Sequence, residues 1–326
     1  MKNTVLFAFL VFGITTLFKE PLNAQPMIQA PFLKSGDTIC VVAPAGVVDV
    51  SKTKAGLALW EKQGYHVKVG KNVYAQNNRF AGTDSQRLAD LQSALNDASC
   101  KAIVCVRGGH GSIHLLDKLD FTSFRKNPKW LIGFSDITVL HEEFQRQGYM
   151  SIHGPMIASS IIEERPSASF NYLMQMLRGN IPSYQFAAHP LNRLGTCTGE
   201  LIGGNLSVIY SLLGNSKYLQ TDGKILFIED LGEQLYHLDR MMYALKISGK
   251  LKQVKALLVG EFIEMKDSGN MKQSVEEIIL NAVSQYNFPV YFNFPAGHDK
   301  NNYPLLFGKK YQLESSTTQV TLKPIN

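Results

Sequence analysis

Short, uninterrupted apolar runs alternate with longer amphipathic segments through most of this sequence. In the first half the apolar runs are TICVV, HVKV, KAIVCV and WLIG, and amphipathic segments at residues 48–63 and 85–96 separate the first three of them. A strand that is apolar on both faces is buried on both faces, which is typical of a parallel sheet covered by helices on each side. The first half is therefore predicted to form a doubly wound α/β domain.

The second half keeps this alternation but ends differently. Its apolar runs KILFI and ALLVG alternate with predicted helices at residues 235–245 and 275–284, and the final segment KKYQLESSTTQVTLKPI alternates with a period of two. That last pattern predicts an antiparallel hairpin. We therefore predict an N-terminal domain at 25–165, a connector at 166–196 with one helix at 172–178, and a smaller mixed α/β domain with antiparallel strands at 197–326.

The first 24 residues differ from the rest of the sequence. Lys2 precedes an apolar stretch at residues 4–18, and Ala24 supplies a small residue at a cleavage point, so the segment is interpreted as a secretory signal. The stretch is shorter than the about 20 residues that span a membrane. An uncleaved anchor stays open as the alternative. We expect a periplasmic or otherwise exported protein, without a stable membrane span after cleavage.

Charge and cysteine content exclude some classes of function. The net charge is +6, but the lysines and arginines are dispersed, which argues against a nucleic-acid partner. The cysteines lack metal-ligand spacing, so no metal site is predicted, and we interpret them as structural and unpaired. They are Cys40, Cys100, Cys105 and Cys197.

Three turns at predicted strand ends are candidates for a site, because ligands bind beyond the carboxyl ends of parallel strands. They are APAG at 43–46, RGGHG at 107–111 and GFSD at 133–136. RGGHG does not fit the dinucleotide-binding pattern, because His114 stands where the third glycine is required. The loop either only turns the chain or presents backbone N–H groups to a developing oxyanion.

The segment GFSDI partly matches the strand–serine–helix elbow G-x-S-x-G, with Ile137 in place of the last glycine. Ser135 is therefore either a helix cap or a nucleophile. A nucleophile needs a base and an acid that orients the base. His298 follows a predicted strand and FPAG, and the carboxylates of Glu229 and Asp230 end the run KILFIED, where burial is costly unless they are partnered.

Taken together, these segments resemble the serine LD-carboxypeptidases (muramoyltetrapeptide carboxypeptidases), a family that also includes the microcin C immunity peptidases. The resemblance extends from about residue 35 to residue 310. It rests on VVAPAG, RGGHGSIHLLDKLDF, PKWLIGFSDITVLH, IHGPM, GELIGGNLSVI, LFIEDLGEQLYHLDRMMYAL, LLVGEF and PAGHDKNNYPLLFG. It implies a flavodoxin-like N-terminal domain that carries the nucleophile and a smaller C-terminal domain that carries the other two catalytic residues.

The resemblance also implies a role for each matching residue. Ser135 would be the nucleophile, Glu229 rather than Asp230 the acid that orients the histidine, and His298 the base. No cofactor is implied.

Further residues follow from this assignment. The backbone N–H of Asp136 and an amide at Gly108 or Gly109 would bind the oxyanion. We expect Arg107 and Asn205 to contact the substrate carboxylate. His110 occupies a place where the family commonly has tyrosine, so it is a further candidate substrate contact.

The expected function is release of the terminal D-alanine from murein tetrapeptides in peptidoglycan turnover, and the resemblance implies a homodimer. Two alternatives stay open. One is a peptidase that cleaves another amide, such as a peptide–nucleotide of the microcin C type, which would need an aromatic side chain to stack on the base. The connector offers candidates for this contact: Phe170, Tyr172, Tyr184 and Phe186. The other is a catalytically silent protein that binds peptidoglycan fragments.

Overall fold

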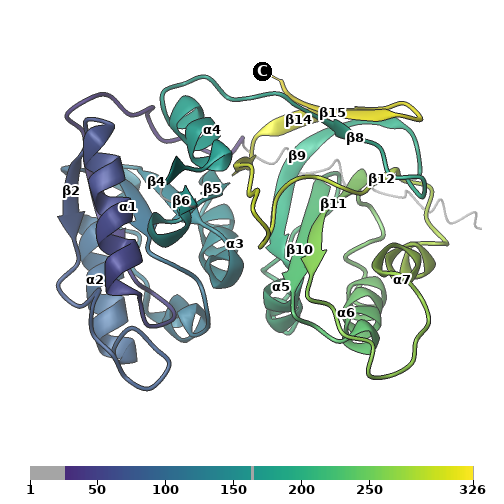
Figure 1. The fold of residues 1–326 in the computed structure, drawn as a ribbon, viewed down its shortest axis with the longest axis horizontal. Coiled ribbons are helices and arrows are strands. Elements are labelled where there is room, and N and C mark those ends of the chain that lie inside the picture. The colour runs from purple at the N-terminus through teal and green to yellow at the C-terminus, as the bar shows by residue number, and fades with distance from the viewer. Residues whose placement is uncertain (1–25, 163–164, 326) are drawn as a thin grey trace, which may run out of the picture.

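The chain forms two α/β halves that lie side by side, each built around its own sheet (Figure 1). The computed structural model describes residues 26–162 and 165–325. The predicted signal at 1–24 lies outside the described residues. Within the described ranges, no helix combines the length and the apolar character needed to cross a membrane.

The first sheet has six strands in the order β13-β5-β4-β3-β1-β2. Its strands are β1 (Thr38–Val42), β2 (His66–Val69), β3 (Cys100–Cys105), β4 (Trp130–Gly133), β5 (Ser151–His153) and β13 (Leu305–Phe307). The first five pair in parallel, and β13 runs antiparallel to β5. Without β13 the order is 2-1-3-4-5, the flavodoxin-like arrangement, so the predicted fold class of this half is confirmed.

Helices cover both faces of this sheet, as its apolar strands require. The helices are α1 (Val50–Lys62), α2 (Asp84–Asn96), α3 (Thr138–Arg146) and α4 (Ala168–Leu177), with 3₁₀ turns η1 (Ser112–Lys118), η2 (Phe124–Lys126), η3 (Ser135–Ile137) and η4 (Ile157–Ser159). One core lies under α1 and α4 around Trp60, and the other under α2 and α3 around Phe144. Side chains of Asp49 and Thr83 cap α1 and α2, which explains why both helices begin where they do.

The second sheet has seven strands in the order β12-β11-β10-β9-β14-β15-β8. They are β8 (Tyr184–Ala187), β9 (Thr196–Asn205), β10 (Ile225–Leu231), β11 (Ala256–Ile263), β12 (Val290–Tyr291), β14 (Lys310–Ser315) and β15 (Gln319–Pro324). Strands β9 to β12 pair in parallel, whereas β9, β14, β15 and β8 pair antiparallel. The predicted mixed sheet and its C-terminal hairpin are confirmed.

One face of the second sheet is covered by helices α5 (Leu206–Leu212), α6 (Leu235–Ile247) and α7 (Val275–Ala282). The other face holds a core of mixed aliphatic and aromatic side chains that includes Phe227, Phe294 and Tyr311. The segment predicted as a connector is more ordered than expected, because it contributes β8 to this sheet as well as a helix. A small separate ladder joins β6 (Ile161–Ile162) to β7 (Arg165–Pro166).

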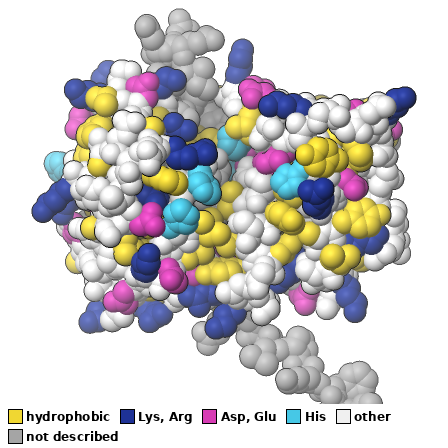
Figure 2. All heavy atoms as spheres, turned by 90° about the horizontal axis from the view of Figure 1, so that it is seen from below, with side chains coloured by type: hydrophobic (Ala, Val, Ile, Leu, Met, Phe, Trp, Pro, Cys, Tyr) yellow, Lys and Arg dark blue, Asp and Glu magenta, His cyan; other side chains and the backbone are white. Residues whose placement is uncertain are grey.

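The two halves are joined by more than the chain connection. Strand β13 comes from the C-terminal part of the chain but pairs with β5 in the first sheet, with Leu305 opposite His153. Seen from below, the two halves enclose a furrow whose floor is apolar and whose walls carry histidine and charged side chains (Figure 2). The cysteines are all free; Cys40, Cys100 and Cys105 are buried, and Cys197 is partly buried.

Candidate active site

Ser135 lies at the sharp turn between β4 and α3, and its backbone is in the left-handed region with φ of 63°. A non-glycine residue in such a conformation costs about 1–3 kcal/mol and persists only when its surroundings enforce it. Helix α3 begins after Ile137, and no side chain caps it. The helix-cap interpretation of Ser135 is therefore wrong, and the turn has the strained geometry of a nucleophile elbow.

The residues around the turn, 133–137, enforce this conformation; we refer to them as the serine elbow. A Cβ on Gly133 would lie 2.9 Å from the Ile137 side chain, so the first glycine makes the room that Ile137 fills. This explains how the elbow forms without a glycine at position 137. Burial lowers the pKa of His141 to about 4, so its imidazole is neutral. It bridges the Gly133 carbonyl and the Ser151 hydroxyl, each at 2.9 Å.

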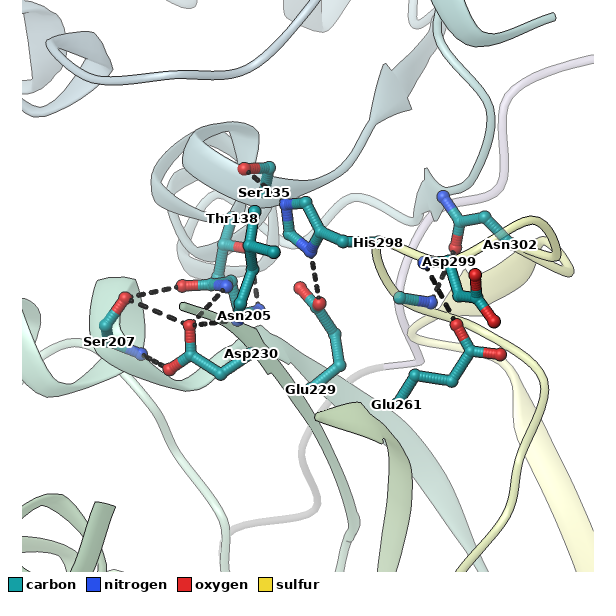
Figure 3. A network of polar contacts seen from close by, with 12 residues as sticks. Ser135, Thr138, Asn205, Ser207, Glu229, Asp230, Glu261, His298, Asp299 and Asn302 are labelled. Atoms are coloured by element: carbon teal, nitrogen blue, oxygen red, sulfur yellow. Dashed lines mark hydrogen bonds and ion pairs between the residues drawn. The ribbon is translucent and has the colours of Figure 1, made fainter. Parts of the chain in front are cut away.

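His298 joins the serine elbow to the second sheet (Figure 3). Its Nε2 lies 2.9 Å from Ser135 Oγ, and its Nδ1 lies 2.7 Å from Glu229 Oε2. Ser135 comes from the first half, Glu229 from β10 and His298 from the segment after β12. The structure thus brings together the three residues that the sequence put forward as nucleophile, acid and base.

The surroundings of His298 favour its protonated form. Burial alone would lower the pKa of this imidazole, but the hydrogen bond and negative charge of Glu229 oppose that effect. With further negative charge from Asp230 and Glu261, the net result is a pKa above the ordinary value. Glu229 is fully buried, and the His298 side chain is 13% exposed. The pair can therefore accept a proton from the neighbouring Ser135 hydroxyl and hold it.

The neighbouring carboxylate, Asp230, points to a different set of partners. It accepts hydrogen bonds at 2.9 Å from the Asn205 side-chain amide and from the backbone N–H groups of Ser207 and Leu231. Burial, followed by the charge of Glu229, raises the pKa of Asp230 to about 7. Glu229 and Asp230 lie next to each other near the end of β10. Within the described part of the chain, Glu229 makes the hydrogen bond to His298 and Asp230 does not.

The glycine loop, residues 107–111, packs against the serine elbow. A Cβ on Gly108 would lie 2.9 Å from Ser135 Oγ and 3.2 Å from the backbone nitrogen of Asp136. The Asp136 carboxylate in turn accepts a hydrogen bond of 2.8 Å from the N–H of Ser112, the residue after the loop, which ties the loop to the elbow. Glycine at position 108 therefore allows the loop to approach Ser135 and the Asp136 nitrogen more closely than a residue with a Cβ could.

The remaining predicted site residues lie around this centre. Gly109 has φ of 120° and packs on Gly46. Arg107 is exposed and donates to the Val47 carbonyl at 3.2 Å, and the exposed His110 lies against Phe80 with their ring centroids 5.8 Å apart. Whether these side chains contact substrate stays a prediction.

Asn205 is buried, and its side chain already has partners in the protein. Its amide oxygen accepts from Val208 N–H at 3.2 Å and caps α5, while its amide nitrogen donates to Asp230. Its backbone N–H donates to Thr138 Oγ1 at 3.0 Å, which links β9 to the helix of the serine elbow. The structure gives Asn205 a role in joining the halves, and substrate contact stays a prediction.

Three of the four aromatic side chains suggested for base stacking are not available for it. Phe170, Tyr184 and Phe186 are at most 9% exposed and form core contacts. Tyr172 is only partly buried and packs on Tyr184 and Tyr303. Of the suggested residues, the peptide–nucleotide alternative therefore keeps only Tyr172.

Sequence reasoning missed Glu261, which belongs to β11 and accepts a hydrogen bond of 3.1 Å from the backbone N–H of Asp299, next to His298. It also missed Asn302, whose side-chain oxygen accepts from Gly297 N–H at 3.3 Å. A signal for Glu261 was present in the segment LLVGEF. A carboxylate that follows a buried strand calls for a partner, as it does in KILFIED.

Comparison with known proteins identifies the family. The model of the LD-carboxypeptidase N-terminal domain matches residues 39–154, and that of the LD-carboxypeptidase C-terminal domain matches residues 198–313. The chain is 36% identical over 307 residues to the probable murein peptide carboxypeptidase of Bacillus subtilis, covering 90% of this chain and 93% of that protein. It is 31% identical over 308 residues to the murein tetrapeptide carboxypeptidase of Pseudomonas aeruginosa, covering 90% and 99%.

A solved structure agrees with both. The crystal structure of muramoyltetrapeptide carboxypeptidase from Oxalobacter formigenes superposes with a TM-score of 0.79 at 29% identity, covering 89% of this chain and 99% of that one. The two domain models match in the order of the two sheets. The chain belongs to the LD-carboxypeptidase family.

Proposed function

We propose that this enzyme is a serine LD-carboxypeptidase that releases the terminal D-alanine of murein tetrapeptides in peptidoglycan turnover. The observation that supports the proposal most strongly is the position of His298, which lies within hydrogen-bonding distance of both Ser135 and Glu229. A serine, a histidine and a buried carboxylate in this order of contact form the arrangement that activates a hydroxyl for acyl transfer.

In the proposed first step His298 Nε2 takes the proton of Ser135 Oγ as the oxygen attacks the scissile carbonyl. The Nδ1–H group of His298 donates a hydrogen bond to Glu229, which fixes the tautomer in which Nε2 carries no proton. The same carboxylate stabilises the imidazolium that forms. The raised pKa of His298 supports this role, because it strengthens the histidine as a base.

The negative charge that develops on the carbonyl oxygen needs donors. The N–H of Asp136 and an amide of Gly108 or Gly109 are assigned to this oxygen, and the closeness of Gly108 to Ser135 supports the assignment. His298 then gives its proton to the leaving amine, so D-alanine departs. In the second half of the reaction His298 takes a proton from water, which attacks the acyl-enzyme, and then returns a proton to Ser135 Oγ. No cofactor takes part in these steps.

The choice of substrate rests on the relatives. The Pseudomonas aeruginosa relative is a murein tetrapeptide carboxypeptidase and the Bacillus subtilis relative a probable murein peptide carboxypeptidase. Both similarities extend over 90% of this chain. A murein substrate also agrees with the predicted export signal, and we propose that the mature protein acts outside the cytoplasm. The N-terminal sequence of the protein recovered from a periplasmic fraction tests this, and recovery of the uncleaved chain from the cytoplasm would contradict it.

The activity is tested by incubating purified protein with a disaccharide-tetrapeptide and following its products by mass spectrometry. We expect loss of one alanine, and Ser135→Ala should lower the rate by about 10⁴-fold or more because the nucleophile is gone. Ser211→Ala is the matched control, since this exposed hydroxyl contacts only the Val208 carbonyl of its own helix. Binding without cleavage by the unmodified protein would favour the silent binding protein, and cleavage by Ser135→Ala would refute the assigned nucleophile.

A further inference from the structure

Strand β11 contains a bulge directly beside Glu229. Ile228 pairs with Val259 and Asp230 pairs with Phe262, so the single residue Glu229 on β10 faces two residues on β11. Those two residues are Gly260 and Glu261. Bulges turn side chains away from the regular alternation of a strand, and they are frequent next to active sites.

The bulge holds the segment 296–299, which carries His298 and is called here the histidine turn. The backbone N–H of Glu261 donates to the Ala296 carbonyl at 2.9 Å, and its Oε2 accepts from Asp299 N–H at 3.1 Å. One residue therefore binds the turn on both sides of His298. Figure 3 shows the contact between Glu261 and Asp299. Gly260 allows this approach, because a Cβ there would lie 2.3 Å from the Ala296 carbonyl oxygen.

A second contact supports the turn from the other side. Asn302 Oδ1 accepts from Gly297 N–H at 3.3 Å, and Asn302 N–H donates to Ser169 Oγ at 2.8 Å. These contacts are neutral. Glu261 differs because its side chain also brings a carboxylate close to the histidine.

Several charged groups surround the Glu261 carboxylate. Glu229 faces it from β10, His298 and Asp299 face it from the histidine turn, and Glu276 of α7 lines the same cavity of about 260 Å³. Burial first, and then the charges of Asp299 and Glu229, raise the pKa of Glu261 to about 7. The Asp299 N–H bond and His298 oppose this shift by favouring the ionised form.

We propose that Glu261 is a positioning residue for His298: its side chain fixes the histidine turn against β11 and places a second negative charge behind the imidazole. The inference deepens the proposed function and rests on it, since it concerns the same base. Glutamine in this position keeps an oxygen that can accept from Asp299 N–H but removes the charge. Alanine removes both, so the two variants separate the mechanical contribution from the electrostatic one.

The experiment compares Glu261→Gln and Glu261→Ala by kcat, KM and the pH profile of kcat/KM on the tetrapeptide. Glu261→Ala should lower kcat by about 10- to 100-fold with little change in KM, because a displaced base acts on the chemical step. Glu261→Gln should restore kcat to within about threefold at alkaline pH, where His298 is neutral in either protein. The acidic limb of the pH profile of Glu261→Gln should move to lower pH, because the loss of a nearby negative charge lowers the pKa of His298.

Glu276→Gln serves as the matched control, because Glu276 lines the same cavity without a hydrogen bond to the histidine turn. It should leave kcat and the acidic limb unchanged. An NMR titration of the His298 imidazole, recorded with and without Glu261→Gln in the Ser135→Ala background, follows the same pKa without turnover. This titration requires no substrate.

The outcomes are distinct. If the unmodified protein cleaves the tetrapeptide but Glu261→Ala matches it, or Glu261→Gln is as impaired as Glu261→Ala, the positioning role is refuted while the proposed function stands. If the unmodified protein does not cleave, the proposed function fails, and the NMR titration decides the effect of Glu261 on His298. If Glu261→Ala does not fold, as judged by circular dichroism, Glu261→Gln decides the question. An unchanged acidic limb of its pH profile, or an unchanged pKa of the His298 imidazole, overturns the inference. A shift of either to lower pH supports it.

Discussion

The two halves of the proposed active site are held in place by different means. Ser135 is fixed by backbone geometry: a left-handed residue at the end of a buried strand, with Gly108, Gly133 and Ile137 packed around it. His298 lies on an irregular segment that side chains and backbone groups of β10, β11 and Asn302 hold through hydrogen bonds.

The difference bears on how each half responds to change. Interiors are packed so densely that one added methyl group is felt, so the serine half should be sensitive to volume. The histidine half is surrounded by carboxyl groups whose pKa values lie close to neutrality, Asp230 and Glu261 at about 7. Its properties should therefore change with pH and with substitutions that alter charge.

The largest effect is expected in the serine half. Gly108→Ala would place a methyl group 2.7 Å from Ser135 Cβ and 3.2 Å from the Asp136 nitrogen, where we place the oxyanion. We expect kcat to fall by about 10²–10³-fold, the loss typical of one oxyanion donor. Steady-state kinetics would measure this, with Gly214→Ala as the control because a Cβ there meets nothing within 4 Å. Unimpaired kcat in folded Gly108→Ala would remove the loop from the oxyanion site.

A smaller effect is expected when volume is added on the histidine side. Gly260→Ala would bring a methyl group 2.3 Å from the Ala296 carbonyl oxygen and displace the histidine turn. A displacement of about 1 Å can cost about 10²-fold in rate, and hydrogen bonds hold this turn, so we expect a loss of about 10- to 100-fold in kcat. If Gly260→Ala impaired kcat more than Gly108→Ala, the greater sensitivity of the serine half to added volume would be refuted.

The smallest effect on activity is expected at Glu142, on the helix that follows the serine elbow. Its Oε2 accepts from Leu219 N–H of the second half at 2.7 Å, its Oε1 has no partner in the described chain, and burial raises its pKa from 4.5 to about 7. Because the folded-state pKa is raised, the carboxyl favours folding below pH 4.5, and this contribution is lost as the pH rises through 7. Glu142→Gln should therefore gain stability at pH 8, on the order of 3 kcal/mol, and little at pH 4.

Urea unfolding at the two pH values measures this difference, and kcat should stay unchanged. An equal gain at both pH values would show that the charge of Glu142 is not its cause. A fall in kcat would show that the serine elbow depends on contacts with the second half, contrary to the comparison drawn above.

Much of this molecule could be predicted from the sequence because the local patterns are strong. The apolar runs around Ile39, Ile103 and Leu131 became parallel strands buried on both faces, and the period-two pattern at the C-terminus became the hairpin of β14 and β15. Ser135, Glu229 and His298 were each suggested by a polar residue at the end of an apolar run. That they meet could not be derived from spacing, and only the family resemblance joined them beforehand.

Features that depend on contacts between distant segments were missed. Strand β8 has only four residues, and it is a strand because β15 lies beside it. The bulge at Gly260 and Glu261 exists only relative to the register of β10. The side chain of Asn205 likewise caps α5 and donates a hydrogen bond to Asp230. Asp230 is 25 residues away in the sequence, so no local pattern reveals this contact.

The pairing of β13 with β5 has a consequence for the order in which the protein forms during synthesis. Residues 305–307 complete the edge of the sheet that carries Ser135, whereas the other strands of that sheet come from residues 38–153. In a nascent chain that contains only the first half, β5 is an open edge of the sheet, because β13 has not yet been made. His298 is also absent at that stage. The first sheet is thus complete only after residue 307 has been made, and deletion of residues 305–307 should damage the domain that was made first.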